Sequence, residues 1–365
     1  MTRLSPSAVL MPLAEARMRL TAGLRPVAPE TCPVGEAAGA VAASDLAAGR
    51  GMPRGRTALR DGWAVDAAAI VGATPYAPVS LAGLSPRVEA GEALPPGTDT
   101  VLPFEAVLDG EAVADAAAGE GTRPAGGELP EGSWLARAGE RLSSLQLLAL
   151  AAAGIGALAV RRPRIALVAT GEASDLLSPL LAALVIGDAA QVAATRSVPD
   201  DPAAIAAALA EAEADAVFAT GGTGFGASDR SAEGLARAGT VAAHGIALRP
   251  GETAGFGVAA GRPVLLLPGR PEAALAVYLA LGRPLVAALA GRILPPAPAA
   301  PLLRKLSSVI GLSEIVFVRR SAEGVEPLGG ADIPLHRLAR ADGAVLVPPE
   351  HEGYAKGTPV EILPL

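Results

Sequence analysis

The segment from Asp215 to Asp229 constrains the fold more than any other part of the chain. It begins as a short apolar run typical of a buried strand and ends in a carboxylate just ahead of a helical pattern. Between these ends lie four glycines: Gly221, Gly222, Gly224 and Gly226. Glycine tolerates positive φ and has no Cβ, so such a loop brings backbone N–H groups and the positive end of the next helix close to an anion. The segment predicts a phosphate-binding loop or a plain tight turn, and its residues leave both open.

Asp229 is the first candidate for a metal ligand, because a carboxylate on such a loop can hold a divalent ion against a bound phosphate. The loop is not a P-loop, since no Gly-Lys-Ser/Thr follows it, and it does not have the GxGxxG spacing. The three histidines are scattered without ligand spacing. We interpret them as surface or loop residues: His244, His336 and His351.

The composition limits the classes of partner. A net charge of -7 and a pI of about 5.2 argue against nucleic-acid binding, which needs a basic face. Lys305 and Lys356 are the only lysines, so a cation that binds phosphate would be an arginine. The single cysteine, Cys32, excludes an intrachain disulfide. The apolar run Leu145–Ala153 is too short to span a bilayer. We expect no secretion signal, because the first residues show no basic stretch followed by an apolar one. We expect a cytoplasmic protein without a membrane or nucleic-acid partner.

Residues 164–290 alternate strand and helix patterns, which predicts a parallel βαβ arrangement. Strands are expected at 164–170, 214–220 and 262–268, and helices at 203–213, 231–238 and 272–290. The strands end in the loops Thr170-Gly171, Thr220–Asp229 and Pro268-Gly269. Ligands of open α/β sheets bind at this rim. The fold class is therefore α/β, with a central domain and a mostly parallel sheet at 164–293.

The flanking regions have other patterns. Residues 1–163 predict an elongated α+β region with a helix within 8–24, a β-rich unit inserted at about 62–140, and a helix that Ser143 or Ser144 caps and that runs to Ala153. The proline-rich residues 294–301 predict a stiff linker. Residues 302–365 predict an all-β module, so the third domain is expected at 294–365.

Several motifs, in this order along the chain, resemble the molybdopterin molybdotransferase family of MoeA and gephyrin E-domain-like proteins. They are Arg60-Asp61-Gly62-Trp63-Ala64-Val65, Gly91–Asp99, Ala169-Thr170-Gly171-Glu172, Thr220–Asp229, Arg249-Pro250-Gly251 and Leu267-Pro268-Gly269-Arg270-Pro271. The match covers nearly the whole length. It implies an N-terminal region with an inserted β unit, a molybdopterin-binding α/β domain and a C-terminal β-barrel-like domain.

The resemblance also implies an activity and its site. Family members are elongated homodimers that take adenylylated molybdopterin and molybdate, release AMP with Mg²⁺ assisting, and leave molybdenum on the dithiolene. Partners are an adenylyltransferase or a molybdoenzyme apoprotein. Catalytic roles fall on Asp61, Asp229 and Glu172, and metal binding falls on Asp229 and Asp61. The expected cofactor-binding residues are Thr170, Gly171, Gly221, Gly222, Thr223, Gly224, Gly226, Ser228, Pro268, Gly269 and Arg270.

The chain departs from the family pattern at several of these positions. Ala90 replaces a threonine, Ala173 a carboxylate and Glu252 a lysine, while Arg270 replaces an asparagine and could supply a compensating cation. Two further functions therefore stay open: a carrier that binds molybdopterin or the finished cofactor without catalysing insertion, and an α/β scaffold whose glycine loops only turn. Without the resemblance, Asp61 is interpreted as a turn-former, because Asp-Gly favours tight turns.

Overall fold

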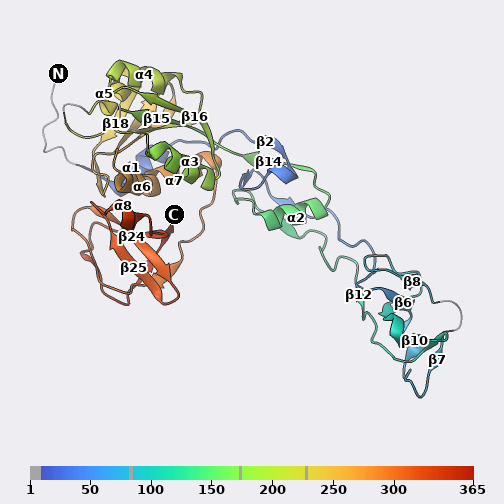
Figure 1. Cartoon of the computed structure of the whole chain (residues 1–365). Helices are drawn as coiled ribbons and strands as arrows, with labels where there is room; N and C mark the ends of the chain where they lie inside the picture. The colour runs from blue at the N-terminus through green and yellow to red at the C-terminus, as the bar shows by residue number, and fades with distance from the viewer. Residues whose placement is uncertain (1–9, 82–84, 172–174, 227–228) are drawn as a thin grey trace.

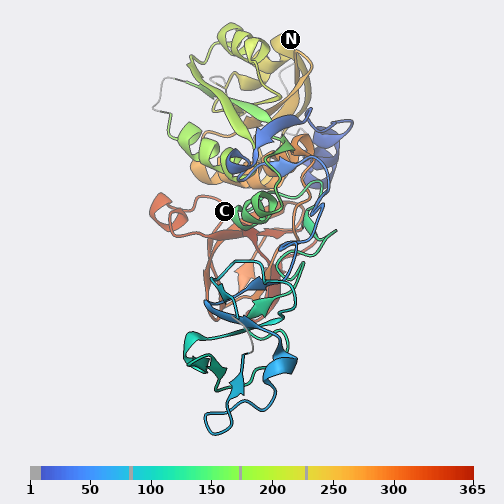
Figure 2. The same cartoon turned by 90° about the vertical axis from the view of Figure 1, so that its right-hand side faces the viewer.

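The computed structural model describes residues 10–81, 85–171, 175–226 and 229–365. The chain forms an elongated molecule, with the α/β domain and the C-terminal domain side by side and a narrow arm that leads away from them (Figures 1 and 2). The arm ends in a separate β unit, called here the distal unit, which comprises residues 57–123. The elongated N-terminal region and the multidomain α/β class predicted from the sequence are confirmed. The domain boundaries proposed at 163/164 and 293/294 stay predictions.

The α/β domain is built on one six-stranded sheet. In spatial order its strands are β16 (Gln191–Val198), β15 (Arg164–Thr170), β17 (Ala216–Thr220), β21 (Arg262–Leu267), β20 (Gly255–Ala259) and β18 (Gly239–His244). The first four run parallel, β20 pairs antiparallel with β21, and β18 pairs antiparallel with β20. The mostly parallel sheet is therefore as predicted.

Helices cover both faces of this sheet because its central strands are apolar on both sides. Ile165 and Leu167 pack on one face with the helices α1, α3, α6 and α7, whereas Ala166 and Val168 pack on the other with α4 and α5. The helices are α1 (Leu13–Thr21), α3 (Leu177–Gly187), α4 (Pro202–Glu211), α5 (Ser231–Ala238), α6 (Pro271–Val277) and α7 (Arg283–Ala290). The Asp201 side chain caps α4 by accepting from Ala204 N, at 2.9 Å.

One helical stretch is long and apolar enough to cross a membrane. It comprises α6, the π-helical segment η4 (Tyr278–Gly282) and α7, with a mean hydropathy of 1.8. Its most apolar window is 83% buried inside the protein, against the sheet and α1, so it is a core helix of the fold.

The C-terminal domain is a curled sheet that extends beyond the predicted module. Its order is β1, β19, β24, β26 and β29, with β25 paired to β24. These strands are β1 (Met11–Pro12), β19 (Ile246–Arg249), β24 (Ser313–Ser321), β25 (Gly324–Gly329), β26 (Gly343–Val347) and β29 (Leu363–Pro364). β19 comes from the α/β domain and pairs in parallel with β24, so a continuous ladder joins the two domains.

The C-terminal β domain predicted from the sequence is confirmed, and the structure adds two details to it. The last residues of the expected linker form β22 (Ala299–Pro301), which pairs with β28 (Pro359–Glu361) because prolines are tolerated where an edge strand does not need the N–H. The module is not all-β, since α8 (Leu335–Leu338) lies between β25 and β26. Two further short strands, β23 (Leu306–Ser307) and β27 (Gly353–Tyr354), pair with each other.

The arm contains small sheets and one helix. Ser143, one of the two caps expected from the sequence, caps α2 (Ser144–Ala152) in a capping box with Gln146. The strands near α2 are β2 (Glu30–Pro33), β3 (Val41–Ala42), β4 (Leu46–Ala47), β13 (Trp134–Ala136) and β14 (Ala157–Arg161). The distal unit holds β5 (Thr57–Ala58), β6 (Gly62–Val65), β7 (Val79–Ser80), β8 (Arg87–Val88), β9 (Thr100–Leu102), β10 (Val107–Leu108), β11 (Glu111–Ala112) and β12 (Thr122–Arg123). The predicted inserted β unit is present.

Candidate functional site

The three glycine-rich loops lie next to each other because β15, β17 and β21 are adjacent parallel strands. Gly221 N donates to Leu267 O at 3.0 Å, and Thr170 Oγ1 donates to Thr220 O at 3.2 Å. Gly221 has φ +89°, and a Cβ there would lie 2.9 Å from Thr170 O. Only glycine fits this junction without strain, so the loop leaves β17 sharply at the carboxyl edge of the sheet.

Side chains outside the predicted set hold the glycine loop. At the start of α5, Ser231 Oγ donates to Gly221 O at 2.6 Å and Ser231 N donates to Gly222 O at 2.9 Å. Asp200 stands between two loops, since a Cβ on Gly171 or Gly222 would lie 3.2 or 3.1 Å from its carboxylate oxygens. Ser231 could have been found from the sequence, because it begins a helical pattern directly after the glycine loop. For Asp200 the sequence indicates only the start of a helix and no contact with the glycine loops.

A cavity of about 320 Å³ opens beside these loops. Its lining residues are Gly222, Thr223, Gly224, Asp229, Gly251, Glu252, Thr253, Pro268, Gly269, Arg270 and Ala273. The structure thus brings most of the predicted α/β-domain residues to one cavity, and their binding roles stay predictions. Thr170, Gly171, Gly221 and Gly226 belong to the same loops but do not line it. Glu172, Ala173 and Ser228 lie outside the described residues.

Asp229 lines the cavity at the end of the glycine loop. Oδ2 accepts from Gly226 N at 3.1 Å, and a Cβ on Gly224 would lie only 2.5 Å from the same oxygen. Among the described residues, no group of three His, Cys, Asp or Glu side chains gathers around a common point. Mg²⁺ is commonly held by one or two carboxylates together with substrate phosphates and water, so the single carboxylate of Asp229 is compatible with that ion, and its role as a metal ligand stays a prediction.

The charge of the cavity wall is mixed. Among the described residues that line it, Arg270 is the only cation. Its Nη1 pairs with Asp332 Oδ1 at 2.6 Å, and its Nε lies 3.6 Å from Glu272 Oε1. Glu252 also lines the cavity, and its Oε2 accepts from Gly251 N at 3.0 Å. Arg270 is thus shared with carboxylates, and an anionic ligand would compete with them for the guanidinium.

His244 is a supporting residue that the sequence interpretation missed. It lies half-buried in β18, so the surface-or-loop interpretation is wrong for this histidine. Its Nε2 is 2.8 Å from Thr223 O, and because a carbonyl only accepts, Nε2 carries a proton. Its ring also lies 5.0 Å from that of Phe225, while Thr223 Oγ1 is 3.2 Å from Thr253 Oγ1. These contacts fix the glycine loop from its outer side.

Asp61 lies in the distal unit, which Figure 1 shows at the end of the arm away from the α/β domain that holds the cavity. It occupies the exposed loop between β5 and β6, and its Oδ1 accepts from Ala90 N at 2.8 Å. This bond fits the turn-former interpretation but leaves the second oxygen free for a ligand. A single chain therefore does not bring Asp61 and Asp229 together.

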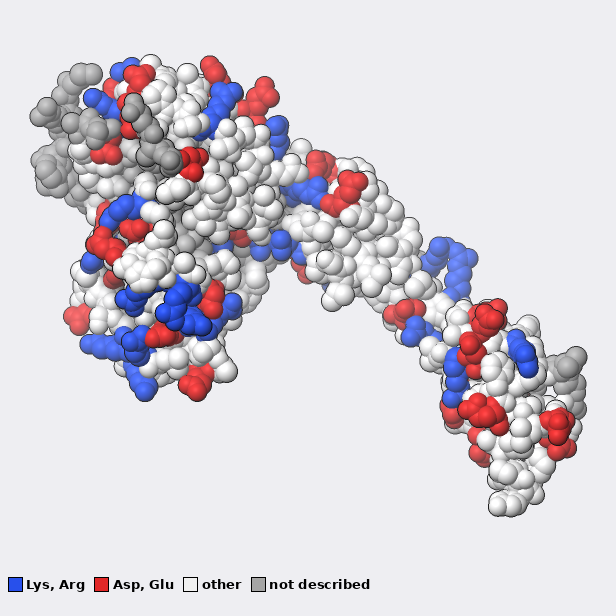
Figure 3. All heavy atoms as spheres, viewed as in Figure 1, with Lys and Arg blue, Asp and Glu red and all other residues white. Residues whose placement is uncertain are grey.

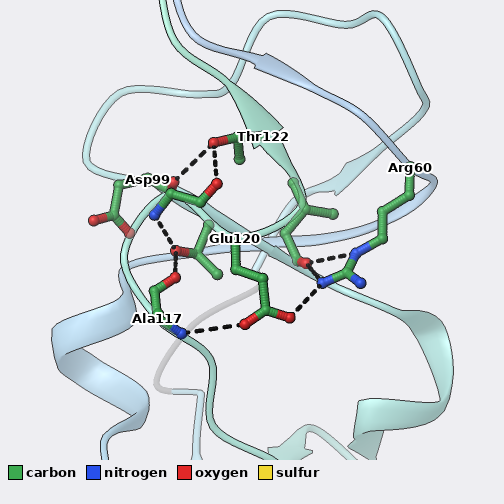
Figure 4. Close-up of polar contacts among 8 residues, drawn as sticks. Arg60, Asp99, Ala117, Glu120 and Thr122 are labelled. Atoms are coloured by element: carbon green, nitrogen blue, oxygen red, sulfur yellow. Dashed lines mark hydrogen bonds and ion pairs between the residues drawn. The ribbon is translucent and has the colours of Figure 1, made fainter.

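The residue before Asp61 is firmly anchored. Arg60 donates to Val101 O from Nε at 3.1 Å and from Nη2 at 2.7 Å, and Nη2 pairs with Glu120 Oε1 at 3.2 Å (Figure 4). Glu120 Oε2 in turn accepts from Ala117 N at 3.3 Å. The loop that carries Asp61 is thus tied to β9 through Val101.

Comparison with known proteins defines the class. Residues 11–154 match the family model described as "MoeA N-terminal region (domain I and II)", and residues 158–288 match the model described as "Probable molybdopterin binding domain". The molybdopterin molybdenumtransferase 2 of Mycobacterium tuberculosis is 30% identical, with 93% of this chain and 96% of the relative aligned. The molybdopterin molybdenumtransferase of Synechococcus elongatus is 28% identical over 92% of this chain and 94% of its own length.

A solved structure agrees with these matches over the whole fold. The molybdopterin biosynthesis MoeA protein of Pyrococcus horikoshii superimposes with a TM-score of 0.76 at 26% identity, covering 98% of this chain and 99% of that one. The chain belongs to the MoeA family of molybdopterin molybdenumtransferases. The family predicted from the sequence motifs is confirmed.

Proposed function

We propose that this chain transfers molybdenum to molybdopterin in the biosynthesis of the molybdenum cofactor. Its substrates would be adenylylated molybdopterin and molybdate, and its products AMP and molybdenum held by the pterin dithiolene. The observation that carries the proposal is the cavity that joins the glycine loop, Asp229 and Arg270 at the carboxyl edge of the sheet, where α/β domains bind their ligands.

The lining residues suit the cleavage of a pyrophosphate. The backbone of Gly222–Gly224 offers N–H donors for phosphate oxygens, as glycine loops ahead of a helix commonly do. Asp229 would hold Mg²⁺, which when bound neutralises charge on the phosphates. Arg270, once released from Asp332, would stabilise the departing phosphate of AMP.

We further propose that the site is completed in a homodimer. Asp61 is exposed in the distal unit, and the arm separates this unit from the α/β domain that carries Asp229 (Figure 1), so Asp61 would reach a cavity only in a second subunit. An apolar surface is available for that contact: Leu145 and Leu148 on α2 are 79% and 68% exposed, and Ile186 on α3 is 58% exposed. Figure 3 shows a broad area without charged side chains over α3 and the neighbouring arm. Exposed patches of this kind commonly mark protein interfaces.

A second function is favoured by the charges of the cavity. Glu252 stands where the family motif has a lysine, and the compensating Arg270 is paired with Asp332. A wall of this charge could hold a finished, metal-bearing cofactor without turning over a nucleotide. In either function the partners would be an adenylyltransferase that supplies the pterin and a molybdoenzyme apoprotein that receives it, in the cytoplasm.

The test is AMP release from adenylylated molybdopterin, with molybdate and Mg²⁺ present or omitted. Asp229→Asn removes the charge but keeps an oxygen that can accept from Gly226 N, so the loop is preserved. Release that depends on molybdate and disappears in Asp229→Asn supports the transferase. The control is Asp109→Asn in the distal unit, at a positive φ of 50° that asparagine tolerates. Tight pterin binding without release by the wild type would favour the carrier.

A further inference from the structure

A second cavity of about 330 Å³ lies where the α/β domain meets the chain's last strand. Its walls come from the end of α3, the start of α7, residues 294–298 and β29, and it shares no lining residue with the Asp229 cavity. Most of the wall is apolar: Ala183, Leu184, Leu294, Pro295, Pro296, Ala297, Pro298, Leu363 and Leu365. This volume and character are typical of small-molecule sites.

Asp188 forms the centre of a buried charge cluster at this cavity. Its Oδ2 accepts from Tyr278 Oη and from Arg283 Nε, both at 2.8 Å, and its Oδ1 accepts from Arg292 Nη1 at 3.0 Å. The side chains of Asp188, Arg283 and Arg292 are only 9%, 14% and 13% exposed. One carboxylate thus faces two guanidinium groups, and both of its oxygens are already occupied.

The cluster therefore keeps one uncompensated positive charge. Arg283 uses Nη1 to donate to Pro364 O at 2.7 Å, whereas Arg292 makes no other side-chain hydrogen bond within the described part of the chain. In the same part of the chain, neither arginine pairs with a second carboxylate. Both arginines line the cavity, so an anion that enters it meets this excess charge beside the unused N–H donors of Arg292. A partly buried cation in apolar surroundings strongly favours an anionic partner.

We propose that this cavity binds a small molecule with one carboxylate head and a short unbranched apolar tail. The head would take the unused donors of Arg292 beside Arg283, since the planar guanidinium matches a carboxylate in two-point geometry. The tail would lie against the leucines and prolines of the wall. Because the walls belong to α3 and α7 on one side and to residues 294–298 and β29 on the other, the bound molecule would also hold these segments together.

The test uses octanoate as the probe, with isothermal titration calorimetry on the full-length protein. Octan-1-ol, which lacks the charge, is the matched ligand control. The proposal expects octanoate to bind at least about tenfold more tightly than octan-1-ol, and Arg292→Met to lose about tenfold in octanoate affinity. Arg304→Met, which removes an exposed arginine paired with Glu326 in the C-terminal domain, should leave the affinity unchanged.

A second variant keeps the test independent of the charge cluster. Ala297→Phe adds bulk to the cavity wall without touching Asp188 or either arginine, and it should abolish octanoate binding. No octanoate binding by the wild type, equal binding of octanol, or binding that survives Ala297→Phe would each overturn the proposal. AMP release is a separate readout at a separate cavity, so failure here leaves the proposed transferase activity intact.

Discussion

Arg270 and Asp332 form an ion pair across two domains, with 2.6 Å between Nη1 and Oδ1. Arg270 lines the candidate site, whereas Asp332 lies on the loop between β25 and α8 of the C-terminal domain. Their side chains are 58% and 77% exposed, so solvent screens the pair and its contribution is small. The cation that the sequence suggested as a replacement for the family lysine is therefore shared with a neighbouring domain, and a phosphate that enters the cavity competes with Asp332 for it.

Removing the charge of Asp332 should strengthen the binding of an anion. We expect Asp332→Asn to tighten the binding of adenylylated molybdopterin by up to about fivefold, the equivalent of an exposed ion pair. Asparagine is the suitable replacement because residue 332 has φ +59°, which asparagine tolerates. Titration calorimetry measures the change. Asp342→Asn, which disrupts the exposed pair with Arg320 elsewhere in the domain, is the control, and unchanged or weaker binding in Asp332→Asn would show that Arg270 does not contact the ligand.

Two inactive variants should complement each other if the site is shared between subunits. Asp61→Asn and Asp229→Asn each alter every site of their own homodimer. A heterodimer of the two has one site with both carboxylates intact, so a mixture that exchanges subunits should recover roughly a quarter of wild-type AMP release. The measurement is AMP release before and after mixing and subunit exchange. If AMP release after verified subunit exchange stays at the level of the separate variants, the site is not shared between subunits.

The sequence predicted the α/β domain well because its central strands are buried on both faces. In the sequence such strands are short continuous apolar runs. The first and last residues of β15, β17 and β21 lie within two residues of the expected bounds. Their glycine-rich ends could be assigned to one rim because parallel strands share a carboxyl edge. The cap of α2 could be predicted as Ser143 or Ser144, because helix capping depends on residues close together in the sequence.

The missed features depend on contacts between residues far apart in the chain. β1 has only two residues and carries no periodic pattern, yet it joins β19 and so the sheet of the C-terminal domain. His244 reaches Thr223 across the sheet edge, and Arg270 reaches Asp332 across two domains, with no spacing rule to reveal either contact. Local patterns therefore predicted the elements and the rim, whereas the electrostatics of the cavity needed the folded chain.

The backbone of the glycine loop should not tolerate a side chain at position 221. Gly221→Ala meets both a positive φ of 89° and Thr170 O at 2.9 Å, whereas Gly261→Ala, in the same domain, meets a φ of 77° with nothing within 4 Å. We expect Gly261→Ala to lower the free energy of unfolding by about 1 kcal/mol and Gly221→Ala by at least about 1 kcal/mol more. Urea denaturation measures both. Equal losses would mean that Thr170 moves away at little cost.

Tyr278 should make the stability of the protein fall at alkaline pH. Burial, and then the negative charge of Asp188, raise the pKa of the Tyr278 hydroxyl above its ordinary value. A tyrosine in the unfolded chain has a pKa of about 10. Above that pH only the unfolded chain releases the hydroxyl proton, which favours unfolding. The contribution of Tyr278 to stability is therefore fully present below this pH and is lost as the pH rises above it.

Tyr278→Phe isolates this contribution. At neutral pH the variant should lose about 1–2 kcal/mol, because Asp188 no longer accepts the tyrosine hydrogen bond. Above about pH 10 its free energy of unfolding should fall less steeply than that of the wild type, so the two curves converge. Urea denaturation from pH 8 to 11 checks this, with Tyr76→Phe as the control, since Tyr76 is 99% exposed. Parallel curves for the wild type and Tyr278→Phe would mean that the hydroxyl ionises as readily in the folded protein as in the unfolded chain, in conflict with its burial beside Asp188.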